Sequence, residues 1–254
     1  IQLQNPAVFS LLVNKTGHVF AGSYEGVWRS TDQGDTWKPV NNGIAHLTIY
    51  ALAQNAAGHL FAGTKEGGVY RSTDNGELWT RTNAGLTHPT VHGLTVNAAG
   101  HLFAGTENFV DGAKVGGVFR STDNGDTWKL VSTGMPPITV YGLVVNSSGH
   151  LFAGARGCRV FRSTDHGESW TPLNTGLKDA KFYGIAVNSS GHLFLGTDQG
   201  AYRSTDQGQT WQAINSGLTN LTVYKLVFNS SGHLFAGTGS GVWRLADKED
   251  AWTR

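Results

Sequence analysis

The sequence is poor in cysteine, in long apolar runs and in net charge. Cys158 is the only cysteine, which excludes an intrachain disulfide and a zinc site built from several cysteines. No apolar run approaches the roughly 20 residues that a membrane-spanning helix needs, and no signal peptide is expected. Lys and Arg total 19 against 18 Asp and Glu, so we expect neither a nucleic-acid partner nor membrane insertion.

Helical periodicity is also missing, whereas 35 glycines indicate many turns. One octapeptide, Ser-Thr-Asp-x-Gly-x-x-Trp, occurs five times, at 30–37, 72–79, 121–128, 163–170 and 204–211, and a degenerate copy covers 245–252. This spacing of about 41–49 residues indicates one unit repeated six times. The expected repeats are approximately 1–41, 42–83, 84–132, 133–174, 175–215 and 216–254, within a single domain over 1–254.

The fourth repeat shows how each unit is expected to fold. Its β-branched and apolar segments predict short strands at 138–146, 150–154, 159–164 and 169–174, separated by turns rich in Gly and Asn. Four antiparallel strands in about 41 residues are typical of a β-propeller blade, whereas solenoid coils are usually shorter. The sequence therefore predicts an all-β, six-bladed β-propeller, with the octapeptide in the hairpin between strands three and four.

The octapeptide has a local physical logic. Its Asp can accept backbone N–H bonds across a tight turn, and its Gly can adopt a positive φ. The closing Trp can bury a large ring between the hairpin and the blade. The structural positions so assigned are Asp32, Gly34, Trp37, Asp74, Gly76, Trp79, Asp123, Gly125, Trp128, Asp165, Gly167, Trp170, Asp206, Gly208 and Trp211.

This motif resembles the Asp-box, or BNR repeat, of sialidases, sortilin-type receptors and xyloglucan-hydrolysing propellers. The fuller phrase at 100–128, with GlyHisLeuPheAlaGlyThr and GlyValPheArgSerThrAspAsnGlyAspThrTrp, is similar to bacterial photosystem II stability and assembly factors and to sensor propellers of two-component regulators. The resemblance implies a structural rather than catalytic role for the box. It also implies a bacterial protein in a periplasmic or secreted setting.

Two other residue types recur in every repeat. Six histidines open the second strands, and equivalent side chains on adjacent blades are too far apart to share one zinc ion. Six arginines lie in the third strands, three residues before each box Asp or its equivalent. We interpret both sets as turn or inter-blade contacts, and we expect neither a metal nor a cofactor. These positions are His18, His59, His101, His150, His192, His233, Arg29, Arg71, Arg120, Arg162, Arg203 and Arg244.

Strand alternation places the turns on two opposite rims. The rim that carries the octapeptides is nearly uniform between repeats, whereas the turns between strands two and three differ, so we place ligand binding on that variable rim. The third repeat has an insertion at 107–115, which we expect to form an exposed loop. One slot at the start of each first strand is aromatic or His. The candidate ligand-binding residues are Tyr50, His92, Tyr141, Tyr183, Tyr224, Glu107, Phe109, Asp111, Arg156 and Arg159.

Three functions remain open from the sequence. The first is a monomeric, non-catalytic binding module that presents the variable rim, with residues 107–115, to a protein or glycan. The second is a carbohydrate-active hydrolase or lyase, which would need two carboxylates facing each other, for a glycosidase about 5–10 Å apart. Glu25, Glu66, Glu107, Asp111 and Asp198 are the rim acids available. The third is a purely structural, or a designed or reconstructed, repeat array, because the copies are so similar.

Overall fold

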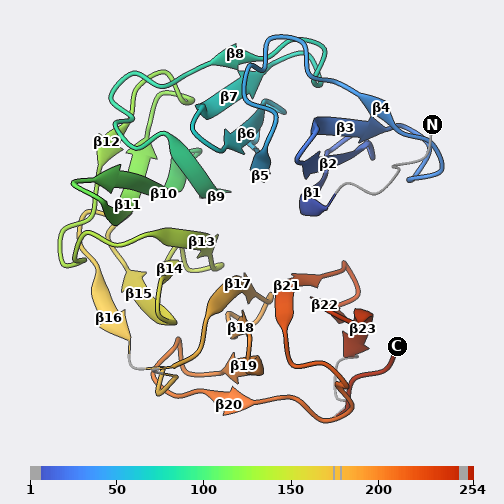
Figure 1. Cartoon of the computed structure of the whole chain (residues 1–254), viewed down its shortest axis with the longest axis vertical. Coiled ribbons are helices and arrows are strands. Elements are labelled where there is room, and N and C mark those ends of the chain that lie inside the picture. The colour runs from blue at the N-terminus through green and yellow to red at the C-terminus, as the bar shows by residue number, and fades with distance from the viewer. Residues whose placement is uncertain (1–6, 174, 178, 246–250) are drawn as a thin grey trace. The chain divides into compact units, whose positions relative to one another are not determined.

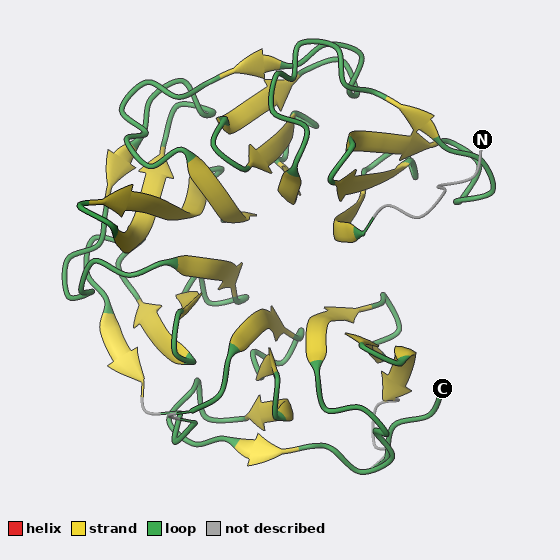
Figure 2. Ribbon diagram, in the orientation of Figure 1, coloured by secondary structure: helices red, strands yellow, loops and turns green. Residues whose placement is uncertain are grey.

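The computed structural model describes residues 7–173, 175–177, 179–245 and 251–254 of the chain (Figure 1). The chain divides into two compact units, at 1–131 and 132–254. Strands and loops make up all of the described residues, as Figure 2 shows. Within this described part, no helix is long and apolar enough to cross a membrane.

The first unit contains three four-stranded sheets, each an antiparallel meander in chain order. The first sheet is β1 (Val8–Val13), β2 (Val19–Ser23), β3 (Gly26–Ser30) and β4 (Lys38–Pro39). The second is β5 (Ile49–Gln54), β6 (Leu60–Thr64), β7 (Gly68–Ser72) and β8 (Thr80–Arg81). The third is β9 (Thr90–Val96), β10 (Leu102–Val110), β11 (Ala113–Ser121) and β12 (Lys129–Leu130).

The second unit repeats this arrangement. Its first sheet is β13 (Val140–Val145), β14 (Leu151–Ala155), β15 (Arg159–Ser163) and β16 (Thr171–Leu173). The next is β17 (Phe182–Val187), β18 (Leu193–Thr197), β19 (Gly200–Ser204) and β20 (Gln212–Ala213). The last described sheet has three strands, β21 (Val223–Phe228), β22 (Leu234–Thr238) and β23 (Gly241–Leu245), and the Arg244–Thr253 bridge adds a fourth segment to it.

The core lies between successive sheets of a unit. In the first unit, Phe20 and Val27 of one sheet pack with Ile49 and Tyr70 of the next, and all four side chains are buried. The recurring glycine of the second strands permits this approach. A Cβ added to Gly63 would lie 2.7 Å from Cγ1 of Val91, closer than real Cβ contacts come. The first strands of neighbouring sheets therefore contact each other, β1 with β5 and β5 with β9.

Each sheet is one blade, and the predicted all-β, six-bladed propeller class with the box in the third hairpin is confirmed. In the fourth repeat every observed strand overlaps its predicted range. The prediction that residues 107–115 form a loop is wrong, because they extend the β10–β11 hairpin instead. Most of the degenerate octapeptide, at 246–250, lies outside the described residues, as do residues 1–6.

Candidate ligand-binding rim

The strand register assigns each turn to one of two rims. In the first blade Val8 pairs with Ser23, and Ser23 with Gly26, so the start of β1 lies beside the β2–β3 turn. At the opposite end Val19 pairs with both Val13 and Ser30, which places the β1–β2 turn and the octapeptide together. We call the end that carries the turn between the second and third strands of each blade the variable rim.

Every first strand contains a β-bulge beside this rim. In the second blade Ile49 pairs with Thr64 and Ala51 with Gly63, so that Tyr50 is the extra residue between them. The same register shift occurs in the other five blades, and the extra residue is always the one in the aromatic slot. A bulge redirects a side chain out of the regular alternation. The six side chains in question are Phe9, Tyr50, His92, Tyr141, Tyr183 and Tyr224.

In the first unit these bulge residues form a continuous row of rings. The Phe9 ring lies 4.5 Å from the Tyr24 ring and 5.3 Å from the Tyr50 ring, edge to face in both cases. Tyr50 in turn stacks on the His92 ring at 4.8 Å. Tyr24 belongs to the β2–β3 turn and is 57% exposed. The row therefore runs across three blades from an exposed tyrosine to a half-buried histidine.

Acidic side chains lie beside the inner end of this row. His92 Nε2 is 3.8 Å from Glu107 Oε2, and the Glu107 side chain is buried. Burial raises the pKa of Tyr50, and the nearby Tyr24, Glu107 and Glu66 raise it further. Both carboxylates thus contribute negative potential at the Tyr50 ring. Sequence reasoning named Glu107 and Tyr50 separately but had no means of joining them.

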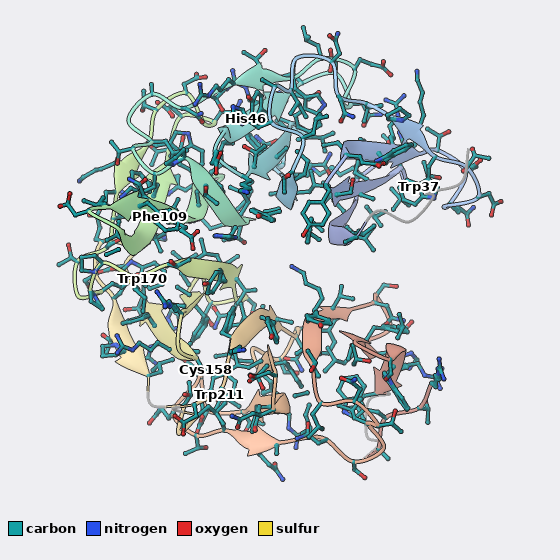
Figure 3. All side chains as sticks on the ribbon, in the orientation of Figure 1. Trp37, His46, Phe109, Cys158, Trp170 and Trp211 are labelled. Carbon is teal, nitrogen blue, oxygen red and sulfur yellow. The ribbon has the colours of Figure 1, made fainter. Side chains whose placement is uncertain are left out.

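The inserted segment is a two-stranded ribbon that projects from the variable rim. Asn108 pairs with Val115, Phe109 with Lys114 and Val110 with Ala113, and Asp111 with Gly112 forms a two-residue turn. Both turn residues have positive φ, 50° and 77°, as expected for a type I′ hairpin. The Phe109 side chain, labelled in Figure 3, is 62% exposed. The ribbon thus holds an aromatic ring in solvent.

In the second unit the corresponding rim has a different chemistry. Tyr183 lies 5.2 Å from Tyr224, and Tyr141 stacks on Phe182 at 6.5 Å. Arg156 and Arg159 flank the β14–β15 turn, and both are exposed. The structure therefore places these two cationic residues on the rim of the second unit and Glu107, Phe109 and Asp111 on the rim of the first.

Cys158, between those arginines, faces inward. Its side chain is buried in a cluster with Val160 and Phe182. Burial raises the pKa of the thiol to about 11, and the charge of Asp198 adds to this effect. A thiol with so high a pKa is a poor nucleophile at neutral pH. Cys158 therefore belongs to the packing of the rim turn (Figure 3).

The opposite rim is a set of closed turns. In the first octapeptide Asp32 Oδ1 accepts bonds from Ser30 Oγ and from the Thr36 backbone N–H, at 2.7 and 2.9 Å. Bonds from Thr36 and Ser30 lower the pKa of Asp32 to about 2. The N–H of Gly34 donates to Ser30 Oγ at 2.8 Å. The box carboxylate thus accepts its hydrogen bonds from residues of its own turn. The same bonds to the box Ser and Asp recur around Asp74, Asp123, Asp165 and Asp206.

The box glycines all have positive φ, and so do the residues that precede them, for example Asn75. The positions concerned are Gly34, Gly76, Gly125, Gly167 and Gly208. The tryptophans use their indole N–H in two ways. Trp79 and Trp128 donate to carbonyl groups of the preceding blade, at Val40 and Thr82. Trp37, Trp170 and Trp211 donate within their own turn.

The repeated arginines and histidines connect blades in the first unit. Arg29 donates to the Asn75 carbonyl at 2.8 Å and pairs with Glu77 at 2.7 Å. His18 Nδ1 lies 2.8 Å from Nδ2 of the same Asn75. Arg71 and His59 make the equivalent contacts to the next box, at Asn124 and Asp126. These residues are therefore occupied by inter-blade contacts, and among the described residues no group of metal-ligating side chains is present.

Together these features define a β-propeller with one uniform, hydrogen-bonded rim and one variable, aromatic rim. Two family models match, each over less than half of the chain. The DUF6242 beta propeller domain matches residues 142–254, and the model described as sortilin, neurotensin receptor 3, matches residues 25–139. No curated protein matches the chain.

Several solved structures share the fold. A GH74 xyloglucanase from Xanthomonas campestris is 18% identical with a TM-score of 0.78, over 98% of this chain and 45% of its own. YCF48 bound to D1 peptide is 17% identical with a TM-score of 0.75, over 100% of this chain and 83% of its own. The extracellular domain of a hybrid two component system from B. thetaiotaomicron is 15% identical with a TM-score of 0.62, over 95% and 38%.

The chain thus spans less than half of that enzyme and of that sensor domain. At these identities the matches establish the shared fold. The resemblance to photosystem II assembly factors and to two-component sensor propellers is confirmed at this level, because structures of both kinds are among the matches. The neighbours include an enzyme and non-enzymes, so fold alone assigns no activity.

Proposed function

We propose that the chain is a non-catalytic binding module whose variable rim engages an extended segment of a partner protein. One observation carries this proposal: a bulge in each of the six first strands redirects an aromatic or His side chain beside the variable rim. Bulges cost regular pairing and are typical of sites where a side chain is re-aimed for function. Aromatic rings are also the side chains that dominate binding energy at protein interfaces.

The projecting ribbon supports the same function. Phe109 and Val110 are 62% and 47% exposed at its tip, and adjacent exposed apolar side chains are typical of contact sites. The match to YCF48, a structure with a bound peptide, is consistent with a peptide-binding role for this fold. A glycan is the other ligand that a row of aromatic rings could accept, and it serves as the competing outcome below.

A carbohydrate-active enzyme is the rival that the GH74 neighbours raise. Such an enzyme would have to use the rim acids, because serine and threonine bonds within their own turns hold the pKa of the box carboxylates Asp32 and Asp206 low. A general acid needs a raised pKa instead. A purely structural or reconstructed array is the third reading, and it gives no role to the exposed Phe109 and Val110 at the tip of the ribbon.

The setting and assembly belong to the same proposal. We place the protein in the periplasm or outside a bacterial cell, as a monomer in which residues 1–254 act as one domain. The neighbouring two component system domain is extracellular, and this supports the location by analogy.

The test is a peptide-display selection and a glycan array with the intact chain. The matched variant replaces residues 107–116 with Lys-Glu-Gly, the turn of the second blade at 65–67. The tripeptide should fit at this position because the strand ends that it connects are equivalent: Thr64 pairs with Gly68 as Thr106 pairs with Gly117. The control variant carries the same tripeptide in place of residues 198–199.

We expect selected peptides to bind the intact chain and the control, and to bind the 107–116 graft at least several-fold more weakly. Binding that is unaffected by the graft removes the ribbon from the site. Glycan binding without peptide binding, or release of sugar from a polysaccharide panel, refutes the proposed function.

A further inference from the structure

The aromatic row of the first unit has a defined shape. We use this name for Tyr24, Phe9, Tyr50 and His92. The planes of Tyr24 and Phe9 meet at 88°, and those of Phe9 and Tyr50 at 73°. Two rings whose planes meet nearly at a right angle can each turn a face toward one ligand, and it is the electronegative faces of aromatic rings, not their edges, that attract a cation. Tyr24 is the open end, at 57% exposure.

Acidic residues outnumber cationic ones around this row. The turns of the variable rim in the first unit contribute the acids Glu25, Glu66, Glu107 and Asp111 and the cations Lys65 and Lys114. Arg81 also reaches this rim, where its Nε–H donates to the Gly67 carbonyl. Glu66 and Glu107 act directly on the Tyr50 ring, where both raise the pKa of its hydroxyl after the larger effect of burial. Negative potential beside the faces of aromatic rings favours a cation and disfavours an anion.

The equivalent rings of the second unit lack this environment. Tyr183 and Tyr224 approach to 5.2 Å, but the residues next to them in the chain are Phe182, Gly184, Val223 and Lys225. Among the described residues, Arg156, Arg159, Lys181 and Arg254 also bring positive charge to that rim, and Asp179 and Asp198 bring negative charge. The same slot therefore carries the same ring chemistry with a different charge in each unit.

We infer that the aromatic row receives a cationic side chain, an arginine guanidinium or a lysine ammonium, from the partner polypeptide, with Glu66 and Glu107 supplying the negative potential. This inference rests on the proposed binding function and names the chemistry that the first unit recognises. The cation lies against the faces of Phe9 and Tyr24, and the carboxylates need not contact it, because they act through the field at Tyr50.

The experiment uses peptides selected by display on the intact chain. Each selected peptide is resynthesised with every arginine changed to citrulline, or every lysine to norleucine, and dissociation constants are measured by calorimetry. The protein variants are Tyr24→Ala and Glu66→Gln, both exposed positions whose replacement leaves the core intact. Tyr183→Ala is the matched control in the second unit.

We expect the neutral peptide to bind roughly 5- to 30-fold more weakly than its cationic parent. In the Tyr24→Ala and Glu66→Gln variants, the dissociation constants of the cationic and the neutral peptide should differ by no more than about threefold. The Tyr183→Ala variant should keep the full difference. The Glu66→Gln effect should also shrink as salt is raised.

Three results overturn the inference. Equal binding of cationic and neutral peptides refutes it and leaves the proposed function standing. A charge preference that survives Tyr24→Ala and Glu66→Gln moves the cation site away from the row. Failure of any peptide to bind the intact chain refutes the proposed function itself, and the inference with it.

Discussion

Substituting Gly43 with alanine tests how the repeats are joined. Gly43 has a φ of 91°, and a Cβ there would lie far closer to the Trp79 carbonyl oxygen than the 3.0 Å that real Cβ atoms respect. The adjacent Asn42 carbonyl accepts the Trp79 N–H at 2.9 Å. The substitution therefore strains the local turn and also pushes apart the contact between the β4–β5 connection and the octapeptide of the second blade.

Gly17→Ala is the matched control, because Gly17 has a similar φ of 83° and no heavy atom within 4 Å of its would-be Cβ. In both variants the free energy of unfolding should fall by about 1–2 kcal/mol, because alanine is strained in the left-handed region. Gly43→Ala loses roughly 1–3 kcal/mol more, as overpacked sites do. This difference corresponds to a melting point lower by roughly 2–12 °C than that of Gly17→Ala.

Urea unfolding followed by tryptophan fluorescence, with thermal melts alongside, measures both variants. Gly85→Ala should behave like Gly43→Ala, since its Cβ would meet the Trp128 carbonyl oxygen in the same way. Equal destabilisation by Gly17→Ala and Gly43→Ala would show that backbone strain alone matters. The contact between the β4–β5 connection and Trp79 would then contribute nothing to stability, and our account of this connection would be wrong.

Three further predictions concern single side chains. Trp79→Phe should lower the free energy of unfolding by about 2–3 kcal/mol, because it leaves the buried Val40 carbonyl without its 2.9 Å donor. Trp37→Phe should lower it by only about 1 kcal/mol, because the Trp37 indole bonds within its own turn. Equal urea midpoints for the two variants would contradict this. Bonds from Thr210 and Ser204 lower the pKa of Asp206 from 3.8 to about 2. Its contribution to stability is therefore fully present above pH 3.8 and is lost as the pH falls through 2, and Asp206→Asn should flatten that part of the urea-midpoint profile. Cys158, whose thiol pKa is raised to about 11 by burial, should react with a disulfide reagent at pH 8 far more slowly in the native protein than in urea; comparable rates would place the thiol at the surface.

The octapeptide made the fold predictable because its logic is local. The turn is closed by hydrogen bonds among Ser30, Asp32, Gly34 and Thr36. Five copies of the octapeptide therefore predict five hairpins without any knowledge of tertiary contacts. The strand ranges followed from the same periodicity. Contacts between blades were harder to predict from the sequence, because a hydrogen bond such as that from Arg29 to the Asn75 carbonyl joins residues 46 positions apart.

The candidate site was predictable only in part. The aromatic slot was visible in the sequence, but the bulge at Tyr50 was not, because one additional residue in a β-branched strand leaves no clear mark in the pattern. The ribbon at 107–115 is different. Its Asp111-Gly112 pair, between apolar residues on both sides, is a strong signal for a two-residue hairpin, so the sequence held enough information to replace the expected loop by two strands.

The variable rim can differ between blades because a constant bond closes each turn below its tip. Thr64 Oγ1 donates to the Gly68 carbonyl at 2.9 Å, and Ser or Thr makes the same bond to Gly in four other blades. The side chains of residues beyond that bond, such as Tyr24 or Glu66, do not take part in closing the turn, so these positions can differ between blades while the blade still folds.

The fourth blade is the exception that supports this reasoning. Ala155 stands where the others have Ser or Thr, so its turn cannot be closed by a hydroxyl. Instead the turn is anchored by the buried Cys158 side chain and by a bond from Thr175 Oγ1 to the Cys158 carbonyl, at 3.0 Å. The one turn without the common bond has a different anchor, which is expected if the fold requires each turn to be closed below its tip and leaves the tip itself available for binding.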